Sequence, residues 1–215
     1  MKLDGLKVNF LGDSITEGHG TSDEKHRYDT VLKDLGELAV TRNYGIGGTR
    51  IAYHSGASVW PVWDLYFCGR ATKMDPDADL VIVFGGTNDY GHGNAPFGTS
   101  EDATPDTFCG AVNWLMKFLR ETYPTAKIVF MTPMRRLGDE APSPLTGHAL
   151  VDYVDAIIDA GTRHGIAVLD LYRELPIDPN IPDMMQRYVP DGLHPNDEGH
   201  KLIAILLYEF LAKLQ

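Results

Sequence analysis

The sequence DLVIVFGGTND at residues 79–89 is an apolar run that ends in a polar, glycine-rich turn. A continuous run such as Asp79 to Phe84, rich in β-branched residues, is typical of a strand that is covered on both faces. Short runs of this kind recur along the chain. They predict five strands, at residues 7–11, 41–44, 79–84, 127–131 and 166–171.

Longer segments with apolar residues at helical spacing lie between and after these strands. They predict five helices, at residues 29–40, 60–67, 104–123, 145–164 and 196–214. Thr104 and Pro105 are expected to start the third helix, and Gly165 to end the fourth. Parallel strands need crossover connections, so this alternation predicts an α/β fold. The expected architecture is a three-layer α/β/α sandwich around a five-stranded parallel sheet.

Length and composition suit one folded domain over residues 1–215. The 19 basic and 30 acidic residues give a net charge of −11, which disfavours nucleic acid and anionic membranes as partners. No apolar run approaches the ~18 residues of a membrane span, and no segment resembles a signal peptide. A cytoplasmic location is therefore expected, whereas the oligomeric state is left open.

Several residues have a structural interpretation in the sequence. Cys68 and Cys109 are too far apart for a thiolate zinc motif and are expected to be buried. The seven histidines other than His194 lack the spacing of metal ligands, so no metal site is expected. Trp60, Trp63 and Phe67 fall at helical spacing, which favours a stripe that faces the core.

Glycine-rich polar segments follow the first two predicted strands. In GDSIT, residues 12–16, the glycine allows a sharp turn that can expose the hydroxyl of Ser14. In NYGIGG, residues 43–48, the glycines can leave a backbone N–H free to face a cleft. The second segment begins like a dinucleotide-binding motif, but Arg50 stands where the third glycine is needed. Nucleotide binding is therefore disfavoured.

Two further segments complete the pattern. GTND, residues 86–89, follows the third strand and can aim the amide of Asn88 at a developing oxyanion. In DGLHP, residues 191–195, Asp191 can hydrogen-bond the imidazole of His194 and support its charge. Each segment alone also fits a cap or a turn. The four together are far more specific.

With these four segments, the sequence resembles the SGNH hydrolases, also called GDSL esterases, over essentially its whole length. That family carries Ser, Gly, Asn and His in this order at the ends of successive strands. The resemblance implies a flavodoxin-like SGNH hydrolase fold with a catalytic triad of Ser14, Asp191 and His194. It also implies an oxyanion hole made by the backbone N–H groups of Ser14 and Gly48 and by the Asn88 amide.

Alignment from Asn43, which often opens the second segment in the family, favours Gly48 over Gly47 as the oxyanion-hole glycine. The family chemistry needs no metal or organic cofactor. Asp13, Tyr90, His92 and Asn94 lie in or beside the segments and are candidates for substrate contact, although carboxylates such as Asp13 more often brace loops.

The resemblance implies a serine esterase, with a small-molecule ester as its partner. The expected substrate is a short-chain ester, an acetyl ester of a sugar or small metabolite, hydrolysed through an acyl-enzyme on Ser14. The absence of a long apolar lid favours a short acyl group over a lipase substrate. An acyltransferase at the same site, a lysophospholipase and a thioesterase are the alternatives. A catalytically silent binding protein is disfavoured, because no member of the triad is missing.

Overall fold

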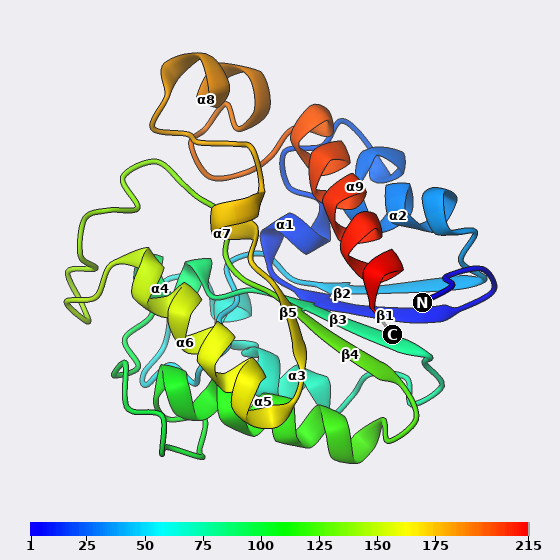
Figure 1. The fold of residues 1–215 in the computed structure, drawn as a ribbon. Helices are drawn as coiled ribbons and strands as arrows, with labels where there is room; N and C mark the ends of the chain where they lie inside the picture. Colours follow the sequence, from blue (N-terminus) through cyan, green and yellow to red (C-terminus); the bar gives the residue numbers. More distant parts are fainter. Residues whose placement is uncertain (215) are drawn as a thin grey trace.

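The computed structural model describes residues 1–214, and its strands form one parallel sheet in the order β2-β1-β3-β4-β5 (Figure 1). The strands are β1 (Lys7–Gly12), β2 (Val40–Gly45), β3 (Leu80–Phe84), β4 (Lys127–Met131) and β5 (Ala167–Leu169). The chain adds β2 on one side of β1 and the later strands on the other. Ligands of such sheets bind beyond the carboxyl ends of the strands, where the order reverses. Here that point lies at β1 and β3.

Helices cover both faces of the sheet, which confirms the three-layer architecture (Figure 1). One face carries α3 (Phe67–Ala71), α5 (Phe108–Thr122) and α6 (Leu150–His164), and the other carries α2 (Tyr28–Gly36) and α9 (Asp197–Lys213). Val81 and Val83 of β3 pack with the first group, whereas Leu80 and Ile82 pack with the second. Every residue of β3 is buried, which explains its uninterrupted apolar sequence.

Six shorter helical elements complete the fold of the described residues. They are α1 (Ser14–Glu17), η1 (Glu24–His26), η2 (Pro61–Asp64), α4 (Thr87–His92), α7 (Leu171–Glu174) and α8 (Pro182–Tyr188). Apart from η2, none of these was predicted, because one or two turns are too short to show a helical period. Two of them lie at the carboxyl ends of the central strands, where ligands of such sheets bind. Helix α1 follows β1 directly, and α4 begins three residues after β3.

Two predicted helix starts need correction. The third helix begins at Phe108, because Thr107 caps it by accepting a hydrogen bond from the Gly110 N–H at 3.1 Å. Thr104 bonds Asp106 instead. The fourth helix begins at Leu150 rather than at residue 145, but it ends at Gly165 as predicted.

The other boundaries have equally local causes. The first predicted helix ends at Gly36, because Glu37 adopts the left-handed conformation with φ 53°. The last strand stops at Leu169, because Asp170 caps α7 by accepting from the Arg173 N–H. Asn196 caps α9 by accepting from the Gly199 N–H, close to the predicted start.

Residues 60–67 do not form the predicted continuous helix. A 3-10 turn, η2, ends at Leu65, and a separate α3 starts at Phe67. Phe67 is buried as expected, but Trp60 is 60% exposed and Trp63 is half-buried. The stripe is broken because a 3-10 turn has three residues per turn and does not keep the α-helical spacing.

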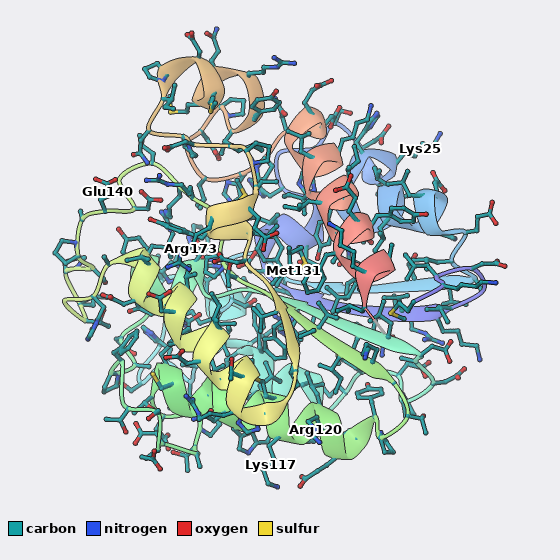
Figure 2. The ribbon with its side chains drawn as sticks, viewed as in Figure 1. Lys25, Lys117, Arg120, Met131, Glu140 and Arg173 are labelled. Atoms are coloured by element: carbon teal, nitrogen blue, oxygen red, sulfur yellow. The ribbon has the colours of Figure 1, made fainter. Side chains whose placement is uncertain are left out.

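Most long charged side chains lie on the exterior, and two apolar clusters fill most of the interior. In Figure 2, Lys117 and Arg120 point away from α5, whereas Met131 lies in the middle of the molecule, where it is fully buried. Cys68 and Cys109 are buried, as predicted, and both are free cysteines. No helix within residues 1–214 combines the length and apolarity that crossing a membrane requires.

The contact between α2 and α9 encloses a histidine. His200 is fully buried, its ring stacks on Tyr28, and its Nδ1 accepts a hydrogen bond from the Tyr28 N–H at 3.2 Å. Burial lowers the pKa of His200 to about 4. The folded protein therefore keeps this imidazole neutral in mild acid, where an unfolded chain would protonate it at a pKa of about 6.5.

We expect the contribution of His200 to stability to be complete above pH 6.5 and to fall as the pH drops toward 4, because the unfolded state binds the proton first. At pH 5 the loss should be about 2 kcal/mol. His200→Asn removes this titration. The difference in free energy of unfolding between wild type and this variant should therefore shrink by about 2 kcal/mol when the pH is lowered from 7.5 to 5. Urea unfolding at both values measures this. A difference that does not change with pH would contradict the assignment.

Candidate active site

Three of the predicted residues form a hydrogen-bonded line. The Ser14 Oγ lies 3.0 Å from the His194 Nε2, and the His194 Nδ1 lies 2.6 Å from the Asp191 Oδ2. The other oxygen of Asp191 accepts from the backbone N–H groups of Leu193 and His194. Burial raises the pKa of Asp191, but these hydrogen bonds outweigh it and leave the pKa below its usual value. The carboxylate is thus ionised and held against the imidazole.

The start of α1 positions Ser14. The Asp13 side chain caps this helix by accepting from the Ile15 N–H at 3.0 Å. A Cβ on Gly12 would lie 1.9 Å from the Thr16 Oγ1, so only glycine allows this close return of the chain. Burial, with the nearby charge of Asp89, raises the pKa of Asp13 to about 7. Ser14 itself is 7% exposed and faces the cleft.

Asn88 lies at the start of α4, with its amide fixed in orientation. One hydrogen of the Nδ2 is donated to the Thr49 carbonyl at 3.0 Å, which leaves the other hydrogen for the cleft. The neighbouring Asp89 is buried and accepts from the N–H groups of Ile51 and Ala52, both at 2.9 Å. Burial raises the pKa of Asp89 to about 6. These bonds fasten α4 to the segment that follows β2.

Gly47 and Gly48 differ in what their N–H groups contact. The Gly47 N–H donates to the Glu17 Oε2 at 2.8 Å, whereas the Gly48 N–H makes no hydrogen bond with any residue of the described chain. Gly48 has φ 72°, and a Cβ there would lie 1.9 Å from the Trp63 Nε1. Both observations favour Gly48 as the glycine with a free donor.

These groups open onto one cleft with a volume of about 450 Å³. Ser14, Gly48, Asn88 and His194 all line it, although they come from four separate parts of the chain. The remaining lining residues are Glu17, His19, Ile46, Gly47, Val62, Trp63, His92 and Leu193. A hydroxyl beside a base, with two further donors close by, is an arrangement suited to nucleophilic attack on a carbonyl.

Of the four candidates for substrate contact, only His92 lines the cleft. Tyr90 is buried, and its hydroxyl donates to the carbonyls of Ala141 and Gly138. The Asn94 amide exchanges hydrogen bonds with the backbone of Ser55. Asp13 is buried as the cap of α1. The structure does not place Asp13, Tyr90 or Asn94 in the cleft lining, and each of these side chains holds a loop or a helix.

The sequence interpretation missed several lining residues. Glu17 and His19 directly follow the GDSIT segment, and the His19 ring lies 4.5 Å from the His194 ring. Their position beside that segment is the one signal that could have identified them. The helical spacing of Trp63 predicts a position in the core, whereas the structure places it in the cleft lining. Within residues 1–214, no group of three or more His, Cys, Asp or Glu side chains is arranged to hold a metal ion.

Comparison with known proteins gives a consistent family. A family model described as the GDSL-like Lipase/Acylhydrolase family matches residues 10–202. An acetylxylan esterase from Xylanibacter ruminicola is 25% identical over 220 residues, which cover 96% of this chain. The match covers 43% of that esterase, so the chain spans less than half of its length.

Solved structures share the whole fold. A protein from Lactobacillus plantarum is 30% identical, with a TM-score of 0.84 and 99% of each chain covered. A structure from Bacteroides ovatus, whose name places it with GDSL-like lipases, is 18% identical, with a TM-score of 0.70. The comparison covers 98% of this chain and 100% of that one. At this identity, the likeness concerns the fold alone.

Proposed function

This chain belongs to the GDSL-like lipase/acylhydrolase family of carboxylic ester hydrolases, and from that premise we propose that it is a serine esterase for short-chain esters. The substrate proposed is an acetyl ester of a sugar or another small metabolite. The observation that carries the proposal is the line Ser14–His194–Asp191, at 3.0 and 2.6 Å, at the edge of a cleft shared with Gly48 and Asn88.

The proposed reaction proceeds in two halves. The His194 Nε2 takes the proton of the Ser14 hydroxyl while the Oγ attacks the ester carbonyl carbon, and Asp191 supports the resulting imidazolium. The N–H groups of Ser14 and Gly48 and the Asn88 amide stabilise the negative oxygen. His194 then gives its proton to the departing alcohol oxygen. In the second half His194 takes a proton from water while the water oxygen attacks the acyl carbon. The bond between that carbon and the Ser14 Oγ then breaks, and His194 returns the proton to the Oγ as the acid leaves.

The choice of an acetyl ester has two supports. The relative from Xylanibacter ruminicola is named an acetylxylan esterase. The cleft, about 450 Å³, must hold both halves of the ester, and Trp63 and His92 occupy one wall of it. A long acyl chain would extend out of the cleft.

A second candidate, an esterase for longer acyl chains, has one specific observation in its favour. The segment after β2 exposes apolar side chains beside the cleft, with Val59 84% and Trp60 60% exposed. Val62 and Leu65 are also exposed, and Val62 lines the cleft itself. An acyl chain that leaves the cleft could lie on this surface. An acyltransferase would use the same groups, with an alcohol in place of water.

A series of p-nitrophenyl esters from acetate to decanoate separates these functions. We expect kcat/KM to be highest for acetate or propionate and to fall at least about tenfold by octanoate, because the added methylenes find no enclosed pocket. A maximum at octanoate or decanoate would replace this proposal with the second candidate. Glycerol added to the acetate assay tests acyl transfer, since acetylglycerol would accumulate at the expense of free acetate.

A further inference from the structure

A buried arginine lies behind the cleft and joins two of its lining residues. Arg50 is 2% exposed. Its Nη1 lies 3.1 Å from the His92 Nδ1, and its Nη2 donates to the Trp63 carbonyl at 3.0 Å. The same Nη2 contacts Ser58 and the carboxylate of Asp64, which compensates the charge. One cation therefore holds both His92 of α4 and Trp63 of η2.

This contact determines which nitrogen of His92 carries the proton. A guanidinium can only donate hydrogen bonds, so the His92 Nδ1 must accept and the proton must lie on Nε2. The imidazole also stacks on the Trp63 ring, with centroids 4.5 Å apart and planes at 30°. The ring is thus fixed both in its plane and against its face.

The imidazole also stays uncharged. Burial lowers the pKa of His92 to about 4, and the charges of Arg50, His54 and Arg136 act in the same direction. Near neutral pH, His92 therefore presents a neutral N–H, with no counter-charge required from a ligand.

The Nε2–H of His92 is free to bind a ligand. This nitrogen makes no hydrogen bond with another described residue. It is also not one of the fully buried polar side-chain atoms that lack a partner. It therefore keeps accessible surface, and His92 lines the cleft. A donor that is oriented so firmly and left without a protein partner is suited to recognise an oxygen of the substrate.

We propose that the His92 Nε2–H donates a hydrogen bond to a hydroxyl or ring oxygen in the alcohol half of the ester, and that Arg50 is the positioning residue for this contact. The inference rests on the proposed function. An acetyl group has no acceptor besides the ester carbonyl, which the oxyanion donors would hold, so the bound oxygen must belong to the alcohol. The Glu17 carboxylate in the same cleft disfavours an anionic alcohol. The substrate class is thus a neutral alcohol that carries at least one further oxygen, such as a sugar.

Two acetyl esters that differ in hydroxyl groups test the contact. They are methyl 6-O-acetyl-glucoside and cyclohexyl acetate, with released acetate as the readout. His92→Phe keeps a ring to stack on Trp63 but removes the donor, so kcat/KM for the glucoside should fall about 3- to 10-fold, mainly through KM. The value for cyclohexyl acetate should change less than about twofold, because that ester lacks the hydroxyls. His92→Gln, which restores an N–H, should recover most of the loss. Equal losses on both esters, or no loss on the glucoside, would overturn the proposal.

A measurement without catalysis tests the role of Arg50. Nitrogen-15 NMR of histidine side chains in the Ser14→Ala protein should show His92 with its proton on Nε2 alone. Arg50→Met should give a mixture of the two neutral forms. A proton on Nδ1 while Arg50 is present would overturn the positioning role. If neither ester is hydrolysed in a manner that depends on Ser14, the proposed function fails and the substrate class with it, and the NMR result still decides the Arg50–His92 contact.

Discussion

Replacing Ser14 with alanine is expected to lower kcat for p-nitrophenyl acetate by about four to six orders of magnitude. The substitution removes the Oγ that lies 3.0 Å from the His194 Nε2, and no acyl-enzyme can then form. The loss should appear in kcat, because the oxyanion donors and the walls of the cleft remain. The measurement is the steady-state rate of each protein, with a stopped assay over long incubation for the slow variant.

The fold should not change with this substitution, because within residues 1–214 the Oγ bonds only His194. Equal melting temperatures of wild type and Ser14→Ala would show this. Ser100→Ala is a matched control, since Ser100 is exposed and lies outside the cleft lining. It should keep full activity. A Ser14→Ala protein that retained a tenth of the wild-type kcat would show that another group is the nucleophile.

Asn88→Ala has the second largest expected effect, a loss of about 100- to 1,000-fold in kcat, which is the usual result of removing one oxyanion donor. The amide is held by the Thr49 carbonyl at 3.0 Å, so its second hydrogen is already directed before substrate binds. Because the negative oxygen develops only during the reaction, KM should change little. Initial rates over a range of p-nitrophenyl acetate concentrations separate the two constants.

A structural explanation of such a loss can be tested in parallel. Asn94→Ala removes a different amide from the same region. That amide bonds Ser55 and lies outside the cleft lining, so the kcat of this variant should stay within about twofold of wild type. Asn88→Asp keeps the shape but replaces the donor with an acceptor, and it should be at least as inactive as Asn88→Ala. Full activity in Asn88→Asp would remove Asn88 from the oxyanion hole.

The sheet could be predicted from the sequence because its pattern is local. The run from Leu80 to Phe84 is buried on both faces and is apolar throughout, and Gly165 and Asn196 mark helix ends by their own backbone or side-chain preferences. The start of the third helix could not be predicted in this way. Thr104 and Thr107 are both threonines, and either could cap a helix. The tertiary contacts of the loop determine that Thr107 is the cap.

The residues that line the cleft depend on long-range contacts, and the sequence pattern does not carry these. Trp63 leaves the core because the buried Arg50 holds its carbonyl and Gly48 leaves room for its ring. Tyr90 turns inward to carbonyls about fifty positions away, at Gly138 and Ala141. Ser14, Asn88 and His194, in contrast, stand inside short motifs whose order along the chain is itself informative.

The hydrogen bond between Ser14 and His194 spans 180 positions of the chain. During synthesis, therefore, the Ser14 hydroxyl emerges from the ribosome long before the His194 imidazole that we propose as its base. A nascent chain that has completed β1 to β5 already has every strand of the sheet, but its Ser14 has no base. The proposed hydrolysis thus becomes possible only after the segment that carries Asp191 and His194 has been added. For the same reason, a cut between α7 and α8 would leave Ser14 on one fragment and His194 on the other. Each fragment alone should be inactive, and activity on mixing them would report that they associate.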